Sequence, residues 1–455
     1  MQKRQVLTAL AVAATVTAGS AATASAAGAG EQAKASGGAQ AGAASANDSL
    51  IHGAPTVRTA HPRLASQDEA AEPEKPLTGT HYVSMQPTRS LDTRTTKEGP
   101  LKAGQSRILK WDKGTIDPRA TAITFNLTVT NATQDTHVTL WSGTGAVPKV
   151  SSINVRAGET RSNQVTVPIG HLQDGTATMG IYNNAGTADV ITDIAGVYGT
   201  GQPNTGEHFT GYTPLKPSRV LDTRERKATM GPNSTAKLDL SGLVPADADS
   251  VTLNMTAINQ SKAAGFLSVY PYGQQRGGIS SVNYMPGATT PNQITVQLGK
   301  DKSLEVYNSA GTVDVLADLV GTYTPGGKGL YYPADPVRVA DTRDGSGTSG
   351  VKGALKPGET INVPFPGEAR KVLAANTNLT GVAGPEATHL TTWDGNGKAP
   401  ETSNLNLNAN QIASNSAAVK VNHDGTVAYF NKNGNTNVVV DVSGYFASEQ
   451  VGQDQ

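Results

Sequence analysis

The segment Val220-Leu221-Asp222-Thr223-Arg224 decides how this sequence is read, because related segments occur at two other places in the chain. They are Ser90-Leu91-Asp92-Thr93-Arg94 and Val339-Ala340-Asp341-Thr342-Arg343. The chain therefore contains an internal repeat of roughly 120 residues, whereas the repeats of solenoid proteins span only about 20–50 residues. A repeat of this size is typical of tandem globular domains.

The three copies agree at several further positions. Each copy begins with an aromatic residue and a proline, for which we take Tyr82/Pro87, Tyr212/Pro217 and Tyr332/Pro336. The later landmarks are an Asn-x-Thr triplet (Asn126, Asn254, Asn378), two spaced asparagines (Asn154/Asn163, Asn283/Asn292, Asn406/Asn415), an aromatic-Asn pair (Tyr182-Asn183, Tyr307-Asn308, Phe430-Asn431) and a closing aspartate (Asp193, Asp318, Asp441). So many matching spacings indicate three copies of one fold.

The N-terminal region differs in composition from the three copies. Lys3 and Arg4 precede an apolar run, and Ala24-Ser25-Ala26 matches a cleavage site, which together predict a secretory signal peptide. The next segment has few large apolar residues and is expected to be a disordered linker or pro-segment. The predicted divisions are the signal peptide (1–26), this linker (27–80), three repeats (81–201, 208–326 and 329–447) and a flexible tail (448–455).

Alternating apolar and polar residues predict β-strands in each copy, as in the segment from Ile123 to Thr130. Turn residues recur about every 8–12 positions, which is typical of all-β sandwiches and barrels. We therefore expect an all-β protein of three tandem β-sandwich domains, immunoglobulin-like or jelly-roll-like, each with about 115–120 residues and eight or nine strands. Near the end of each copy, loops such as Asn308-Ser309-Ala310-Gly311 predict a β-hairpin.

Composition excludes several classes of function. The 455 residues include no cysteine, so we expect no disulfides, zinc–thiolate sites or thiol nucleophiles. The 37 basic and 37 acidic residues balance, which disfavours electrostatic binding of nucleic acid. After the signal peptide no apolar run reaches the roughly 18 residues of a membrane span. We therefore expect no nucleic-acid partner, no membrane insertion, no cofactor and no metal.

The run from Pro217 to Arg224, together with the closing Asp-x-x-Gly-x-aromatic pattern, resembles the tandem Leu-Asp-Thr-Arg repeat modules of secreted actinobacterial proteins. The resemblance covers residues 82–447. Ser90 replaces the valine of the motif in the first copy, and Ala340 replaces the leucine in the third. The resemblance implies a secreted, all-β accessory module that occurs alone or appended to hydrolases, and it implies no particular chemistry.

The charged residues of the motif have two interpretations. Asp92 and Arg94 lie two residues apart and so face the same way on a strand, which fits either a ligand clamp or a structural ion pair or turn anchor. The closing aspartates lie in apolar strands and need a partner, so we expect Asp193 to lie near Arg94. Recurrence in every copy favours the structural role. The residues to which we assign it are Asp92, Arg94, Asp193, Asp222, Arg224, Asp318, Asp341, Arg343 and Asp441.

Trp141, Tyr270 and Trp393 are the candidate ligand-binding residues. In the segment from His137 to Trp141, Val138 and Leu140 form the core face, so the tryptophan points to the opposite face. An exposed flat ring there can stack on a sugar, and Trp and Tyr are enriched at binding surfaces. The alternative is that a loop or a neighbouring domain covers these rings.

The recurring asparagines also have two interpretations. Asparagine side chains cap turns and tolerate left-handed backbone. Their amides can also donate to and accept from sugar hydroxyls, so an asparagine-lined face is the alternative.

We therefore expect a secreted, extracellular, non-enzymatic protein that binds cell-wall or extracellular polysaccharide at several sites, which raises its avidity. The alternative is a structural or protein-interaction role, as a surface-layer component or as an adaptor or inhibitor of a secreted enzyme. A remote alternative is a hydrolase, because paired carboxylates can act in glycoside cleavage. The sequence contains no Gly-x-Ser-x-Gly or His-Glu-x-x-His motif.

Overall fold

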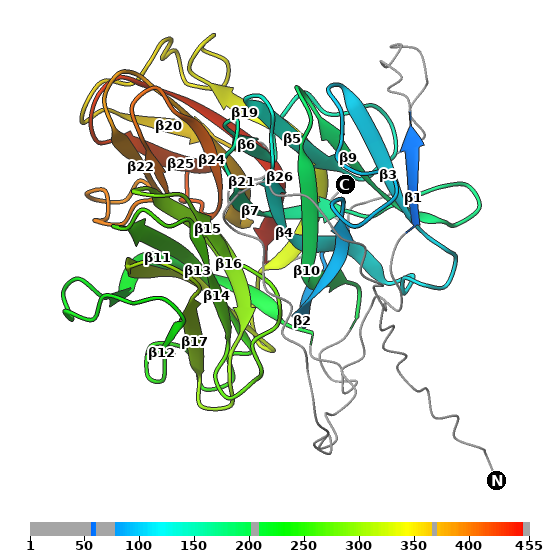
Figure 1. Cartoon of the computed structure of the whole chain (residues 1–455), viewed down its shortest axis with the longest axis horizontal. Coiled ribbons are helices and arrows are strands. Elements are labelled where there is room, and N and C mark those ends of the chain that lie inside the picture. Colours follow the sequence, from blue (N-terminus) through cyan, green and yellow to red (C-terminus); the bar gives the residue numbers. More distant parts are fainter. Residues whose placement is uncertain (1–55, 61–77, 202–208, 366–370, 449–455) are drawn as a thin grey trace, which may run out of the picture. The chain divides into compact units, whose positions relative to one another are not determined.

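The computed structural model describes residues 56–60, 78–201, 209–365 and 371–448, and in these residues the chain is all-β (Figure 1). Strand accounts for 57% and helix for 0% of the structure, so no described helix is long and apolar enough to cross a membrane. The predicted signal peptide, most of the predicted linker and residues 449–455 lie outside the described residues.

Each copy of the repeat forms eight or nine strands. Repeat 1 (81–201) contains β2 (His81–Asp92), β3 (Gln105–Trp111), β4 (Ala120–Thr130), β5 (Thr136–Trp141), β6 (Ile153–Val155), β7 (Arg161–Pro168), β8 (Gly170–His171), β9 (Ala177–Asn183) and β10 (Asp189–Gly199). Repeat 2 (208–326) contains β11 (Gly211–Asp222), β12 (Ser234–Asp239), β13 (Ser250–Asn259), β14 (Gly265–Pro271), β15 (Val282–Tyr284), β16 (Thr289–Gln297), β17 (Ser303–Asn308) and β18 (Val313–Thr324). Repeat 3 (329–447) contains β19 (Leu330–Asp341), β20 (Thr360–Pro364), β21 (Val372–Ala383), β22 (Thr388–Trp393), β23 (Leu405–Leu407), β24 (Ile412–Lys420), β25 (Thr426–Asn431) and β26 (Thr436–Ala447).

The strands form six small antiparallel sheets in a propeller-like arrangement, two sheets from each repeat. The inner sheets, as we name them, are β2-β10-β4-β7, β11-β18-β13-β16 and β19-β26-β21-β24. The outer sheets are β1-β3-β9-β5-β6 with β8 beside β9, β12-β17-β14-β15, and β20-β25-β22-β23. Apart from β1, which precedes repeat 1, the described strands of each sheet all come from one repeat, so the repeats exchange no strands among the described residues.

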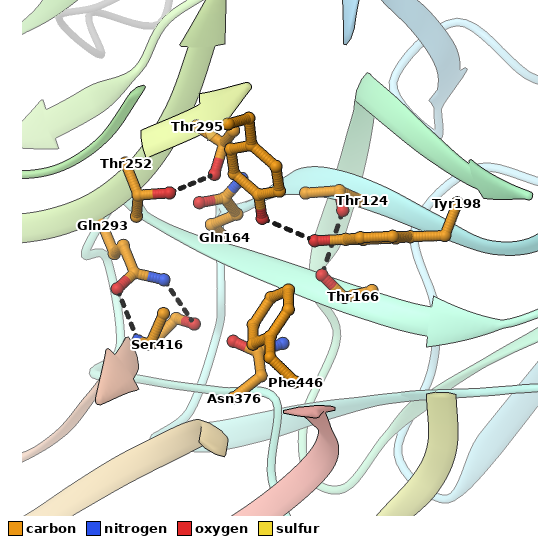
Figure 2. Close-up of a pocket in the computed structure, with 12 residues that line it drawn as sticks. Thr124, Gln164, Thr166, Tyr198, Thr252, Gln293, Thr295, Asn376, Ser416 and Phe446 are labelled. Carbon is orange, nitrogen blue, oxygen red and sulfur yellow. Dashed lines mark hydrogen bonds between the residues drawn. The ribbon is translucent and has the colours of Figure 1, made fainter. Parts of the chain in front are cut away.

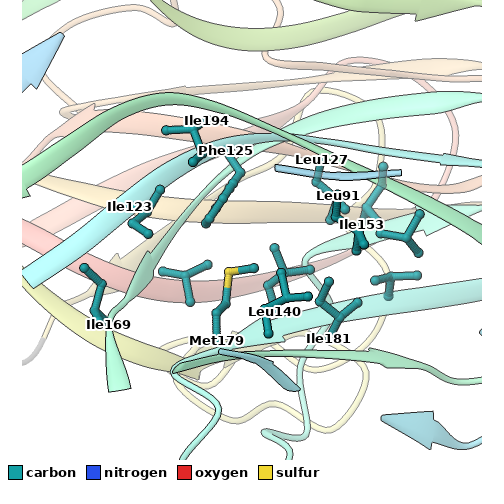
Figure 3. Packing of buried hydrophobic residues seen from close by; sticks show 14 of the residues in the cluster. Leu91, Ile123, Phe125, Leu127, Leu140, Ile153, Ile169, Met179, Ile181 and Ile194 are labelled. Atoms are coloured by element: carbon teal, nitrogen blue, oxygen red, sulfur yellow. The ribbon is translucent and has the colours of Figure 1, made fainter. Parts of the chain in front are cut away.

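The inner and outer sheets of each repeat pack together around one hydrophobic core. In repeat 1, Phe125 and Leu127 of the inner strand β4 meet Leu140, Met179 and Ile181 of the outer sheet (Figure 3). The apolar members of the predicted alternation are all fully buried there, which confirms that the β4 pattern marks one core-facing side. Burial of this kind is the main stabilising contribution to a chain that has no disulfides.

The predicted terminal hairpins are wrong. β17 pairs with β12 and β14 of the outer sheet, whereas β18 pairs with β11 and β13 of the inner sheet. The chain therefore crosses from one sheet to the other between Asn308 and Val313 instead of turning back on itself. The turn residues still have a local role, because Gly311 adopts a φ of +63° and the Asn308 side chain donates to the Gly311 carbonyl.

β1 (Thr56–Ala60) lies within the segment that composition predicts to be a disordered linker. It pairs along its whole length with β3, from Thr56 opposite Lys110 to Ala60 opposite Ser106. The expectation of disorder is therefore wrong for these five residues, because the free backbone groups of the edge strand β3 supply hydrogen bonds that composition does not reveal.

Candidate functional site

Three hydrogen bonds that involve the recurring asparagines join repeat 2 to repeat 1, and a fourth anchors the same asparagine within repeat 2. The Asn126 side chain donates to the Ser280 carbonyl at 2.7 Å, and Asn292 donates to the Asn126 side-chain oxygen at 2.9 Å. Asn292 also donates to the Ser281 carbonyl at 2.6 Å, and its own oxygen accepts the backbone N–H of Gln164 at 3.0 Å. The Asn292 amide thus uses both N–H groups and its oxygen.

The same contacts recur at the other two junctions, and we call the whole set the asparagine clasp. Repeat 3 binds repeat 2 through Asn254→Ser403, Asn415→Asn254 and Gln293→Asn415, and Asn415→Asn404 is the bond within repeat 3. Repeat 1 binds repeat 3 through Asn378→Ser151, Asn163→Asn378 and Ser416→Asn163, and Asn163→Ser152 is the bond within repeat 1. The contacts therefore close a cycle of three within one chain. Five of these six side chains are buried, Asn378 is partly buried, and all six bond across the junctions, so both the turn-capping and the sugar-binding interpretations are wrong for them.

The other recurring asparagines have local roles. Asn283 accepts a hydrogen bond from the Ser280 hydroxyl at 3.0 Å, three residues earlier. The buried Asn183 side chain donates to backbone carbonyls in the turns around it, including those of Leu101 and Gly186. The turn-anchoring interpretation is therefore confirmed for this second group of asparagines.

Six aromatic rings form a closed ring where the three repeats meet. Consecutive centroids lie 4.3–5.1 Å apart, and contacts within a repeat alternate with contacts between repeats. The order of the rings is Tyr82, Tyr323, Tyr212, Phe446, Tyr331, Tyr198 and again Tyr82. The equivalent of Tyr82 and Tyr212 in repeat 3 is therefore Tyr331, and our expectation of Tyr332 is wrong. Tyr331 lies five residues before Pro336, the same spacing to the proline as in the other two repeats.

The hydroxyls of Tyr198 and Tyr323 hydrogen-bond to each other at 2.7 Å inside this ring. Burial raises the pKa of both tyrosines well above the usual value, and neighbouring tyrosines raise it further. Both hydroxyls therefore stay protonated at physiological pH. One of them donates its proton to the other, and the second hydroxyl can donate to a further acceptor.

A narrow polar pocket lies beside the aromatic ring and is lined by four corresponding residues from each repeat (Figure 2). The Thr124 and Thr166 hydroxyls hydrogen-bond to each other within repeat 1, and those of Thr252 and Thr295 do so within repeat 2. In the third repeat the smaller Ala418 takes the place of Thr166 and Thr295. The central region is therefore only approximately threefold.

Two glutamines show the consequence of this asymmetry. Gln293 reaches into repeat 3, where its oxygen accepts the backbone N–H of Ala418 and its nitrogen donates to Ser416 at 3.4 Å. The corresponding Gln164 oxygen is buried and has no partner among the described residues. The residue of repeat 2 that corresponds to Ala418 is Thr295.

The motif aspartates and arginines form a relay in each repeat. In repeat 1, Asp193 is bound by Arg89 at 2.8 Å, Arg89 also contacts Asp92 at 3.1 Å, and Asp92 binds Arg94 at 2.6 Å. The corresponding relays are Asp318–Arg219–Asp222–Arg224 and Asp441–Arg338–Asp341–Arg343. The hydrogen-bonded partner of the closing aspartate is therefore Arg89 or its equivalent, whereas Arg94 acts on Asp193 through its charge alone.

The signal for this second arginine was present in the sequence as Pro-x-Arg at the start of each motif. We missed it because Arg89 lies three residues before Asp92, a spacing that places the two side chains on opposite faces of a regular strand. The register of β2 against β10 shifts between Thr192 and Asp193, and this bulge brings the arginine to both carboxylates.

The carboxylates of the relay differ in pKa. Burial raises the pKa of Asp193 and outweighs the hydrogen bond from Arg89. Burial also opposes ionisation of Asp92, but the hydrogen bond and charge of Arg94 outweigh it and lower its pKa. In repeat 2 the hydrogen bond from Arg224 lowers the pKa of Asp222 to about 2. These carboxylates are therefore tied into structural ion pairs.

Two of the three candidate binding aromatics are buried. Trp141 is 2% exposed and Trp393 is 5% exposed, so the prediction that they form open platforms is wrong. Trp141 lies flat over the strand residue opposite, because a Cβ on Gly180 would come within 2.4 Å of its indole ring. The neighbouring repeat closes over the next residue, where Asp335 accepts from both the Ser142 backbone and its hydroxyl at 2.8 Å.

Tyr270 differs from the two tryptophans. Glu305 stands opposite it in place of a glycine or an alanine, and the tyrosine remains partly exposed. Partial burial raises its pKa, and the neighbouring Glu305 raises it further. Tyr270 is therefore a neutral hydrogen-bond donor beside a carboxylate.

Repeat 2 presents further aromatic residues on the outward side of its outer sheet. Phe266 and Tyr307 are partly exposed with centroids 6.3 Å apart, and Tyr272 is 41% exposed. The Arg276 guanidinium lies 4.0 Å from the Tyr307 centroid, and the Lys237 ammonium lies 4.1 Å from the Tyr272 centroid. We call this group, with Tyr270 and Glu305, the outer face of repeat 2.

Repeats 1 and 3 lack these additions. Trp141, Tyr270 and Trp393 each lie twelve residues before the first residue of the next strand, so the positions between correspond one to one. Glycines replace Tyr272, histidines replace Phe266, and small apolar residues replace Arg276. The replacing residues are Gly143 and Gly395, His137 and His389, and Val147 and Ala399.

No group of three or more His, Cys, Asp or Glu residues that could hold a metal ion occurs in the part of the chain that the structure describes.

No protein-family model matches the chain, and no curated protein matches it in sequence. Among solved structures, a chain from Sulfolobus turreted icosahedral virus matches with a TM-score of 0.17 and 8% identity over 82% of this chain and 92% of that chain. The tandem CBM22-1–CBM22-2 domain of Paenibacillus barcinonensis Xyn10C matches with a TM-score of 0.15 and 10% identity over 57% of this chain and 99% of that chain. Likenesses at these TM-scores carry no argument about this protein.

Proposed function

We propose that this protein is secreted and non-enzymatic and that it binds cell-wall or extracellular polysaccharide through the outer face of repeat 2. The observation that carries the proposal is the gathering of four aromatic side chains, Phe266, Tyr270, Tyr272 and Tyr307, on the side of one sheet that points away from the core. Aromatic rings supply flat apolar surface together with polar hydroxyls, which suits the alternating apolar and hydroxyl faces of a sugar ring.

Polar groups beside the rings give this surface directional contacts. Glu305 offers carboxylate oxygens as acceptors, and Arg276 offers guanidinium N–H groups as donors while its plane lies over Tyr307. A pair of neighbouring sugar hydroxyls can donate to the one and accept from the other. The charges of these two residues offset each other and Lys237 is paired with Asp301, so the surface suits a neutral hydroxyl-rich chain.

The proposal includes three β-sandwich units, each formed by the inner and outer sheets that share a core. The asparagine clasp fixes these units relative to one another, so weaker outer-face sites can act together with repeat 2. Candidates are the partly exposed pairs Tyr182/His137 in repeat 1 and Phe430/His389 in repeat 3. Several weak sites held by one chain raise the effective concentration of each.

The relay residues support binding rather than glycoside cleavage. A pair of catalytic carboxylates needs one free acid and one free base or nucleophile. Here Asp193 is 1% exposed and bound by Arg89, and Asp92 is bound by two arginines. Their hydrogen-bonding capacity is used within the protein.

A pull-down on insoluble peptidoglycan, chitin, cellulose and xylan tests the proposal. We expect wild-type protein to bind at least one of these, and the Tyr270→Ala/Tyr272→Ala variant to bind that polymer at least about tenfold more weakly. Leu243→Ala is the matched control, because Leu243 is 54% exposed on the same repeat and lies outside the outer face. Binding that is unchanged in the tyrosine variant, or absent for every polymer, would contradict the proposal.

A further inference from the structure

Repeats 1 and 2 differ at one edge of their outer sheets. In repeat 1, β3 has β9 on one side and β1 on the other. In repeat 2, β12 occupies the corresponding edge, and β17 is its one neighbour among the described strands. An edge strand presents unpaired N–H and C=O groups, onto which a further strand can add.

The registers show which residues of β12 correspond to the β1-binding residues of β3. Ser106 of β3 lies opposite Tyr182, and Thr235 of β12 lies opposite the equivalent Tyr307. Residues 235–239 of β12 therefore correspond to residues 106–110 of β3, all five of which pair with β1. The alternate residues Thr235, Lys237 and Asp239 are exposed, so this edge is accessible to another chain.

We propose that β12 binds an extended peptide segment of a partner protein, in the antiparallel register in which β1 pairs with β3. β1 shows the kind of sequence that suits this edge, since Thr-Val-Arg-Thr-Ala is rich in β-branched residues. The main-chain hydrogen bonds of such an added strand supply affinity, and side chains at alternate positions supply specificity.

The charge on β12 sets the chemistry of the partner at one position. Arg58 of β1 pairs with Ile108 of β3, and the residue of β12 that corresponds to Ile108 is Lys237. Like charges directly opposite each other across two strands are destabilising, whereas opposite charges are favourable. A partner segment with an acidic residue opposite Lys237 should therefore pair with β12 more favourably than the β1 sequence, which has Arg58 at that position. The present pairing of Lys237 with Asp301 is exposed on both sides and so is easily exchanged.

β20 is the third corresponding edge, and it is a poorer acceptor. Thr360 lies opposite Phe430, so Thr360 to Pro364 correspond to residues 106–110. Proline has no N–H, which removes one hydrogen-bond donor from the edge. β20 therefore serves as an internal control for β12.

Fluorescence anisotropy with labelled peptides of residues 54–62 tests the charge rule on the full-length protein. We expect the peptide with Arg58→Glu to bind about threefold more tightly than the unchanged peptide, in line with a cross-strand charge pair. The Lys237→Glu variant should reverse this order, which assigns the effect to β12 and not to displacement of β1 from β3. The absence of saturable binding, or the same order for both proteins, would overturn the proposal.

Disulfide cross-linking locates the bound peptide, because the chain has no cysteine of its own. Ala60 of β1 pairs with Ser106, so a peptide with Ala60→Cys should react with the Thr235→Cys variant of the full-length protein. The matched control is Thr360→Cys, at the corresponding position of β20. We expect at least about fivefold faster cross-linking at position 235, and equal rates at the two positions would contradict binding at β12.

Discussion

The side-chain amide of Asn292 donates to the side-chain oxygen of Asn126 over 2.9 Å, although the two residues lie 166 positions apart in different repeats. Asn292 is 0% exposed and Asn126 is 8% exposed. Buried amides are stable only when their donors and acceptors find partners. Each repeat therefore needs its neighbour to satisfy its own asparagines, and the three junctions together close the cycle.

Replacing Asn292 by alanine should destabilise the protein by about 3 kcal/mol, because it leaves the Asn126 oxygen and the Gln164 N–H without their partner and removes one of the two hydrogen bonds to the Ser281 carbonyl. The measurement is the free energy of unfolding in guanidinium chloride. Asn283→Ala is the matched control, since Asn283 accepts a local bond from Ser280 and should cost less than about 1 kcal/mol. Equal losses in the two variants would show that the clasp does not carry the stability of the junction.

The closing glycines make room for the aromatic ring. A Cβ on Gly321 would lie 2.2 Å from the Tyr212 hydroxyl, whereas a Cβ on Gly278 has nothing within 4 Å. Gly321→Ala should therefore displace Tyr212 and cost about 1–3 kcal/mol, as overpacking typically does. Gly278→Ala should be nearly neutral. Near-ultraviolet circular dichroism should change only in Gly321→Ala, and an unchanged tyrosine spectrum there would contradict the packing argument.

The strands and their core-facing residues were predictable from the sequence, because alternation along β4 depends on nearest neighbours within one strand. The sheet to which a strand belongs was not. Asn308 and Gly311 mark a turn correctly, but a turn signal does not say whether the following strand pairs with the preceding one or crosses to the other sheet. The predicted hairpins failed for this reason.

The candidate site was predictable only in part. The alternation placed Trp141 and Tyr270 on the face away from the core, and they do lie there. The sequence could not show which residue lies opposite each ring. Gly180 lies opposite Trp141 and leaves space for the indole to pack against the sheet, whereas the larger Glu305 lies opposite Tyr270. The asparagine clasp could not be predicted from the sequence either, because the sequence of one repeat does not reveal that its polar residues bond to another repeat.

The two arginines of the relay should differ in their contribution to stability. Arg219→Met leaves Asp318 buried without its partner and should cost about 3–5 kcal/mol. Arg224→Met removes a side chain that is 50% exposed, and the backbone N–H of residue 224 and Arg219 still bind Asp222, so this variant should cost less, about 1–2 kcal/mol. Guanidinium unfolding of both variants at pH 7 checks the order. A larger loss of unfolding free energy in Arg224→Met than in Arg219→Met would indicate that Arg224 is the more important partner of Asp318.

The pKa of Asp222 predicts how stability depends on acid. Its folded-state pKa of about 2 lies below the reference value of 3.8, so its stabilising contribution is complete above about pH 4 and is lost as the pH falls towards 2. Asp222→Asn should therefore lower the free energy of unfolding by about 2 kcal/mol at pH 6, and the difference from wild type should shrink between pH 4 and pH 2. Glu225→Gln, on the exposed neighbouring turn, controls for the loss of a surface charge. A difference for Asp222→Asn that stays constant down to pH 2 would mean that the hydrogen bonds from Arg224 do not stabilise the ionised carboxylate.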